Sequence, residues 1–183
     1  MHLRQYTLLA IASAIVYFLL FQLNATVFSP LESSFGVNWI FIPSGIRLAA
    51  ILLGGFVGAV GIALGSLVIV ITTYDSPLSV FALGTALISG FSPLLARRIA
   101  TDLLKLDTEL VNLKAIGLLK IALLFSIISA SAHQLWFNAF ERNDNFLREL
   151  FVMGFGDFVG TVIVLLALGV SYAWWAKIRL TER

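Results

Sequence analysis

The sequence predicts an all-α integral membrane protein, a six-helix polytopic bundle that forms a single domain over residues 1–183. Sixty per cent of its 183 residues are hydrophobic and only 12% are charged, with a mean hydropathy of +0.98. A soluble domain carries about a quarter charged residues. Apolar segments also recur from Tyr6 to Trp175, which leaves no room for a separate soluble domain. Most of the surface is therefore expected to face lipid.

A helix needs about 20 apolar residues to cross a bilayer. The first apolar run follows a charged start that contains His2 and Arg4, as in a signal peptide. No small-x-small cleavage site comes after it, so we expect a retained helix. The expected spans are residues 6–23, 39–54, 55–73, 77–95, 115–137 and 150–175.

The second and third spans are expected to form a tight hairpin, because Gly54-Gly55 joins them with almost no polar residues. Residues 39–54 are short for a crossing and contain Pro43 near their start, so this segment is expected to begin irregularly, buried in protein. Pro77 fits the first turn of the fourth span. Residues 24–38 are expected to form a polar loop, and residues 141–149 a charged one.

The distribution of basic residues predicts that both termini lie in the cytoplasm, because cytoplasmic loops are enriched in Lys and Arg. With that orientation the outer side holds only Arg142 and Arg148. The bias requires an even number of spans. The inner side holds Arg4, Arg97, Arg98, Lys105, Lys114, Lys177, Arg179 and Arg183.

Three ionisable residues fall inside the expected spans, in the outer part of the membrane: Arg47, His133 and Asp157. A charged group in lipid is costly, which makes each of them a functional hypothesis by default. One interpretation is a polar pocket, open to the outside, that binds a small molecule or senses protons. The other is a structural ion pair that fixes the helix packing.

Glycines are concentrated around the third span, where Gly54/Gly58 and Gly61/Gly65 form small-xxx-small pairs. Such pairs let helix backbones approach closely. We expect them to pack within the chain rather than to form a dimer.

The linker between the fourth and fifth spans has a one-sided apolar stripe, which predicts a short amphipathic cytoplasmic helix. This helix could lie on the membrane, extend the fourth span or dock a partner helix. The stripe consists of Ile99, Leu103, Leu106, Leu110 and Leu113.

Several classes of function are excluded or disfavoured by composition. The absence of cysteine excludes disulfides and thiolate metal sites. The two histidines lie at opposite ends of the chain and no helix face carries paired carboxylates, so we expect neither an enzyme nor a metal or cofactor site. The net charge of +2 is scattered, which disfavours a nucleic-acid partner. The expected partners are the lipid bilayer, another membrane protein and a small-molecule ligand.

Residues 41–46, which read FIPSGI and run into the apolar residues 48–54, resemble the signature of the MASE-type membrane-associated sensor domains. Gly156-Asp157 with Gly160 is similar to that family's Gly-Asp element before its closing span, and residues 129–131 fall in its small-residue helix. The resemblance covers about residues 37–175. It implies a sensory module of the bacterial inner membrane, usually attached to a cytoplasmic kinase or cyclic-dinucleotide domain.

The sequence departs from that family at Pro43-Ser44, where two prolines are usual, at Arg47, and in ending at Arg183 without an output domain. Our first hypothesis is therefore a small inner-membrane subunit of sensor-like ancestry that acts through a partner membrane protein, using the linker stripe and the glycine faces. The second is a carrier, similar in size to the substrate-binding subunits of vitamin importers, with residues 24–38 capping its pocket. The third is a purely structural subunit of a larger complex.

Overall fold

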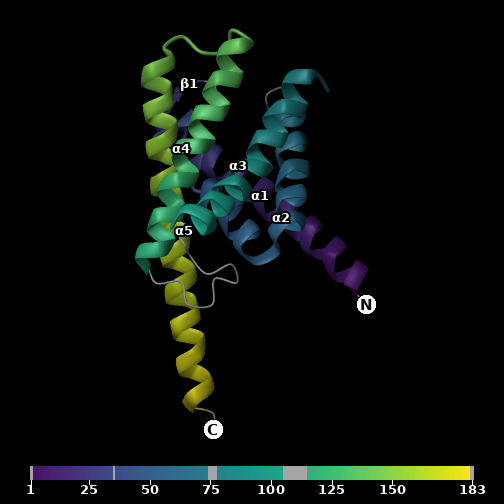
Figure 1. Cartoon of the computed structure of the whole chain (residues 1–183), viewed down its shortest axis with the longest axis vertical. Coiled ribbons are helices and arrows are strands. Elements are labelled where there is room, and N and C mark those ends of the chain that lie inside the picture. The colour runs from purple at the N-terminus through teal and green to yellow at the C-terminus, as the bar shows by residue number, and fades with distance from the viewer. Residues whose placement is uncertain (1, 35, 74–77, 105–114, 182–183) are drawn as a thin grey trace.

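The computed structural model describes residues 2–34, 36–73, 78–104 and 115–181. Within these ranges, five helices are long and apolar enough to cross a membrane, which is the architecture of a multi-pass membrane protein (Figure 1). The elements in chain order are α1 (His2–Val27), the 3-10 helix η1 (Ser29–Leu31), β1 (Glu32–Ser34), β2 (Val37–Asn38), α2 (Pro43–Thr73), α3 (Val80–Leu104), α4 (Ala115–Ala139) and α5 (Phe146–Thr181).

Helix α2 is interrupted at Gly55, where the backbone adopts φ 53° and ψ −127°. A side chain would be strained at this positive φ, so glycine is required there. The chain reverses at this point: the backbone of Gly58 lies against the carbonyl of Ala50, so closely that a Cβ on Gly58 would collide with it. A continuous helix would hold these two residues about 12 Å apart.

The two halves of α2 correspond to the expected second and third spans, so five long elements stand where six separate helices were expected. The first half begins at Pro43 rather than Trp39. Residues 39–42 are not helical, and Pro43 explains the boundary because it occupies the first helical turn, where an amide hydrogen is not needed.

Helices α1, α4 and α5 extend beyond their expected limits. Helix α3 extends beyond its expected end but begins at Val80 rather than at residue 77, and Pro77 lies outside the described residues. Helix α3 continues through Arg97-Arg98 to Leu104, since arginine is a good helix former and the end of an apolar run need not end a helix. Helix α5 has 36 residues, which corresponds to about 54 Å. Its carboxyl-terminal part, yellow in Figure 1, extends beyond the other helices.

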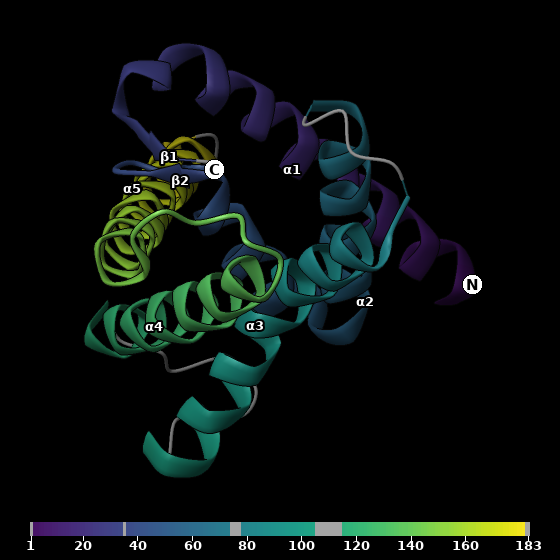
Figure 2. The same cartoon turned by 90° about the horizontal axis from the view of Figure 1, so that it is seen from above.

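Residues 24–38 are more ordered than the expected polar loop. They include the end of α1, η1 and an antiparallel hairpin of β1 and β2, with Gly36 at φ 66° between the strands. The amide of Trp39 donates to the carbonyl of Leu31 at 3.1 Å and closes this unit. Figure 2 shows the hairpin beside α5 at one end of the bundle.

The amphipathic helix expected in the linker is described only in part. Ile99 and Leu103 belong to α3. Leu106, Leu110 and Leu113 lie outside the described residues.

Helix α2 is the centre of the packing, because it contacts α1, α3 and α5, while α4 packs between α3 and α5. Figure 2 shows this arrangement from above. The first half of α2 is thereby packed among the other helices, and all its residues from Pro43 to Ile51 except Ile46 are buried.

Candidate functional site

The site is built where residues 38–44 cross α5. The amide of Phe41 donates to the carbonyl of Gly156 at 3.2 Å. A Cβ on Gly156 would collide with the carbonyl of Asn38, and one on Gly160 with the carbonyl of Phe41. The two glycines therefore allow a non-helical segment to lie directly on the helix backbone. The two sequence elements that carry the family resemblance are in contact here.

Ser44 joins the start of α2 to α5. Its hydroxyl lies 2.7 Å from the carbonyl of Phe41 and 2.7 Å from the carbonyl of Asp157, and it is 3.1 Å from the hydroxyl of Thr161. Ser44 and Thr161 are fully buried. Because each polar group here has a partner within the protein, the first turn of α2 is fixed against α5 without access to water.

Arg47 lies one turn further along α2 and is 1% exposed. Its Nη1 is 3.7 Å from Oδ2 of Asp157, and its Nε donates to the backbone carbonyl of Ser89 at 2.9 Å. Its guanidinium carbon lies 5.0 Å from the centre of the Phe125 ring, a cation–π distance. One positive and one negative charge thus lie together inside the bundle.

This ion pair is incompletely bonded. Nη2 of Arg47 and both carboxylate oxygens of Asp157 have no well-aligned hydrogen-bond partner among the described residues, although the side chain of Ser129 interacts with Asp157. Buried polar atoms are nearly always bonded, so each exception calls for an explanation. The unused capacity means that the pair can accept a water molecule or a proton without breaking other hydrogen bonds.

His133 joins the cluster through Ser89. Its Nδ1 is 2.9 Å from the carbonyl of Ser129, which can only accept, so Nδ1 carries the hydrogen. In the neutral ring Nε2 is then the acceptor, and the hydroxyl of Ser89 donates to it at 3.2 Å. Ser66 in turn donates to Ser89 at 2.9 Å. The result is a directed chain of hydrogen bonds from Ser66 to the backbone of α4.

A cavity of about 50 Å³ lies beside this chain, and we name it the central cavity. Every long helix contributes to its wall, and Gly36 of the β hairpin covers one side. A water molecule occupies about 30 Å³ of liquid, so the space suits one or two waters. Its polar lining residues are Tyr17, Arg47, Ser66, Thr85, Ser89 and His133.

A second cavity of about 60 Å³, which we name the vestibule, lies beside the β hairpin and shares two wall residues with the central cavity. Its wall includes the exposed side chain of Glu32 together with Asn24 and Thr73. Phe21 and Phe41 line both cavities, and their rings meet edge to face with centres 6.0 Å apart. These two residues therefore belong to the walls of both cavities.

The three ionisable residues singled out from the sequence are all buried and belong to one cluster. Arg47 pairs directly with Asp157, whereas the hydrogen bonds that connect His133 to Arg47 pass through Ser89. Sequence reasoning missed the hydroxyl residues that connect them. These residues could have been recognised as isolated serines and threonines within apolar runs. The missed residues are Ser44, Ser66, Ser89 and Thr161.

The four glycines singled out from the sequence lie at helix contacts within the chain. Gly54 faces Leu9, and Gly61 and Gly65 lie against backbone carbonyls of α1. Gly58 lies against the first half of α2. These contacts agree with the expectation that the glycines pack within the chain.

The described residues contain no group of three or more His, Cys, Asp or Glu side chains that could hold a metal ion. What the cluster can do is exchange a proton or hold a water-sized species beside a buried charge pair. Comparison with protein-family models, curated proteins and solved structures finds no match for this chain.

Proposed function

We propose that the chain is a small polytopic membrane subunit of sensor-like ancestry that acts through a partner membrane protein. The observation that carries this proposal is the buried pair of Arg47 and Asp157, which keeps unused hydrogen-bonding atoms beside a water-sized cavity. A purely structural pair gains stability from complete bonding. An incompletely bonded pair is better suited to a change of state.

The proposed signal is a proton taken up by Asp157. The central cavity of about 50 Å³ is far smaller than the 300–1,000 Å³ of typical metabolite sites, so its size favours water and protons over a vitamin-sized ligand. The carrier hypothesis would require a much larger opening of the bundle. The exposed carboxylate of Glu32 in the vestibule would attract cations, including hydronium, towards the Phe21–Phe41 contact.

Protonation of Asp157 would leave Arg47 as a buried cation without its counter-charge. Such a state is strongly destabilised, so the helices around Arg47 must rearrange. The titratable groups that face the pair from other helices are Tyr17 of α1 and His133 of α4. Because Ser44 joins the start of α2 to α5, a displacement of Arg47 would be transmitted to α5.

The carboxyl-terminal half of α5 is the surface that we propose contacts the partner. It extends past the other helices and carries exposed apolar side chains. A movement of its amino-terminal half at Asp157 is carried along a continuous helix to this surface. The exposed residues include Val170, Tyr172, Trp174 and Trp175.

We also propose six membrane crossings with both termini in the cytoplasm, in the inner membrane of a bacterium. The reversal at Gly55 supports this count, because residues 39–54 lead towards it and the second half of α2 leads back. Nη1 of Arg97 donates to the carbonyl of Ile51, close to the reversal. Basic residues therefore lie at the end of the bundle that the sequence assigns to the cytoplasm. The bacterial origin rests on the family resemblance alone.

The test is a pH titration of the full chain in lipid nanodiscs, followed by tryptophan fluorescence. With Trp174 and Trp175 replaced by Phe, the reporters are Trp39, which packs on Phe151 and Phe155 of α5, and Trp136, which donates to Phe81 of α3. We expect a pH-dependent change in the emission of these two residues.

Two matched variants show which carboxylate causes the fluorescence transition. Asp157→Asn should abolish the transition, whereas Asp144→Asn, which alters an exposed carboxylate at the loop before α5, should keep it. A transition that persists in Asp157→Asn would contradict the proton-sensing role. Chemical cross-linking in native membranes addresses the second half of the proposal: a chain that never cross-links to another membrane protein would contradict the subunit role.

A further inference from the structure

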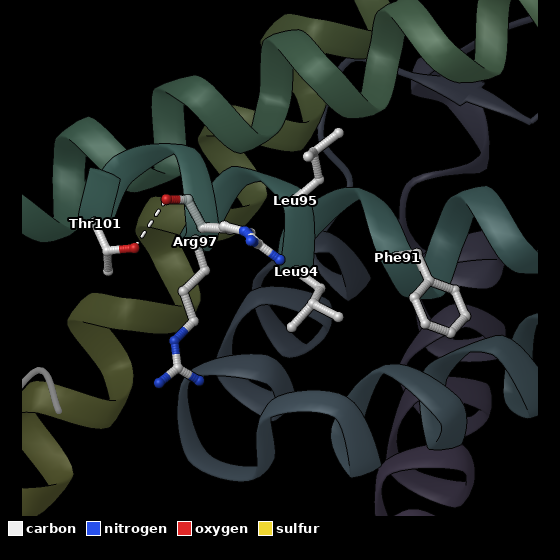
Figure 3. Close-up of a pocket in the computed structure, with 6 residues that line it drawn as sticks. Phe91, Leu94, Leu95, Arg97 and Thr101 are labelled. Atoms are coloured by element: carbon white, nitrogen blue, oxygen red, sulfur yellow. Dashed lines mark hydrogen bonds between the residues drawn. The ribbon is translucent and has the colours of Figure 1, made fainter. Parts of the chain in front are cut away.

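A groove of about 490 Å³ runs along α3 at the end of the bundle where Gly55 reverses α2. It is larger than the central cavity and lies outside the polar cluster. Figure 3 shows its lining side chains along α3, with Phe91 at one end and Thr101 at the other. The lining residues are Phe91, Leu94, Leu95, Arg97, Arg98 and Thr101.

One end of the groove is basic. Arg97 is half-buried and donates from Nη1 to the carbonyl of Ile51 at 2.9 Å, which anchors its guanidinium beside the reversal of α2. Arg98 is 83% exposed, and its ion pair with Asp102 is long, at 3.9 Å, and exposed. Exposed ion pairs of this kind are weak, so Arg98 can exchange Asp102 for a stronger anionic partner.

The other end of the groove is apolar. Phe91 packs its ring on Phe56 of α2, with ring centres 5.7 Å apart, and Leu95 is half exposed. Two guanidinium groups and a hydroxyl thus adjoin a hydrocarbon-lined trough on one helix face. In a membrane protein, this arrangement matches a molecule with an anionic head and an apolar tail.

We propose that this groove binds an anionic phospholipid of the bilayer. Its phosphate would contact Arg98 within the positive field of the neighbouring Arg97, and an acyl chain would lie along Phe91 and Leu95. Free phosphate fits less well because it would leave the apolar trough uncovered. A zwitterionic lipid would bring no net charge to the two arginines. Because Arg97 also holds the carbonyl of Ile51, the bound lipid would stabilise the reversal of α2.

The experiment is native mass spectrometry of the purified full chain, titrated with phosphatidylglycerol or with phosphatidylcholine carrying the same acyl chains. Arg98→Gln should weaken binding of phosphatidylglycerol by about fivefold and leave phosphatidylcholine unchanged, since one basic residue at an anionic surface contributes about that much. Arg179→Gln, which removes an exposed arginine from α5, is the matched control and should have no effect. Leu95→Trp leaves both arginines in place but fills the apolar trough, so this variant should also bind phosphatidylglycerol more weakly.

The outcomes separate a lipid site from simpler alternatives. If the chain bound phosphatidylglycerol and phosphatidylcholine with equal affinity, the proposal would be overturned. It would also be overturned if Arg98→Gln and Arg179→Gln weakened binding of phosphatidylglycerol equally, because the attraction would then be unspecific. If inorganic phosphate displaced the lipid equally well from the wild type and from Leu95→Trp, the site would recognise phosphate alone and not the acyl chain. Unchanged binding in Leu95→Trp would show that the acyl chain lies elsewhere. None of these outcomes depends on the proton-sensing role of Asp157.

Discussion

The amide of Phe41 donates a hydrogen bond to the carbonyl of Gly156 at 3.2 Å, and the carbonyl of Phe41 lies directly over Gly160. This contact explains how a non-helical segment is tolerated inside a membrane bundle. Irregular backbone is accepted at membrane depth only where protein satisfies its polar groups. The next amide, that of Ile42, is bonded to the side chain of Asn24 at 2.9 Å.

Gly160→Ala is expected to destabilise the protein by about 1–3 kcal/mol, the usual cost of overpacking a filled interior. The added methyl group would collide with the carbonyl of Phe41, which cannot move without losing the Gly156 hydrogen bond. Thermal unfolding in detergent measures the effect. Gly169→Ala is the control on the same helix, because no atom lies within 4 Å of a Cβ there. Equal melting temperatures for the two variants would contradict the close contact.

The apolar runs were sufficient to predict the long helices, because a segment that must bury its backbone in lipid has few structures open to it. Arg47 and Asp157 were identifiable for a similar reason, since a charge at that depth needs a partner. The β hairpin was not predicted, because strands as short as β1 and β2 are too short to have a recognisable period.

Two further features of the site could not be read from residue types. Arg47 binds the backbone carbonyl of Ser89, and a carbonyl is present at every position, so the sequence holds no signal for this contact. The role of Gly160 depends on which segment crosses α5, which is a property of the tertiary fold. The reversal at Gly55 was expected, because paired glycines join the second and third spans. The start of α2 at Pro43 was not expected, because residues 39–42 were counted as part of the helical span.

Removal of one member of the buried ion pair should cost more than removal of both. Arg47→Leu leaves Asp157 buried and without a counter-charge, which we expect to destabilise the protein by about 3–5 kcal/mol. In the double variant Arg47→Leu/Asp157→Leu, no charge remains to be buried, so most of the stability should return. Denaturant unfolding in mixed micelles compares the three proteins.

The control for the ion pair is the exposed pair of Arg98 and Asp102, whose side chains are 83% and 68% exposed. Arg98→Leu should change stability by less than about 1 kcal/mol, since exposed pairs contribute little. If the double variant at Arg47 and Asp157 were no more stable than Arg47→Leu alone, the two groups would not be coupled. The cluster would then owe its stability to the Ser89 and Phe125 contacts of Arg47.

The absence of cysteine allows a direct test of the six crossings. Leu53 lies next to the reversal in α2 and is 83% exposed. A single cysteine at Leu53 should therefore react with a membrane-impermeant reagent from the side of the amino terminus. A single cysteine at the exposed Asp144 should react only from the opposite side. Labelling of both positions from the same side would contradict a reversal of α2 across the membrane.

Asn24→Ala should destabilise the protein by about 1–3 kcal/mol, because it removes the acceptor of the Ile42 amide and leaves a buried donor without a partner. Asn24 is 2% exposed and lies near the end of α1, so this one side chain joins α1 to the non-helical segment. Thr26→Ala removes an exposed hydroxyl that bonds only within α1 and should be almost neutral. Hydrogen exchange followed by mass spectrometry should show faster exchange at residues 39–42 in Asn24→Ala alone. Unchanged exchange there would mean that the Gly156 carbonyl and the glycine contacts on α5 are enough to hold the segment in place.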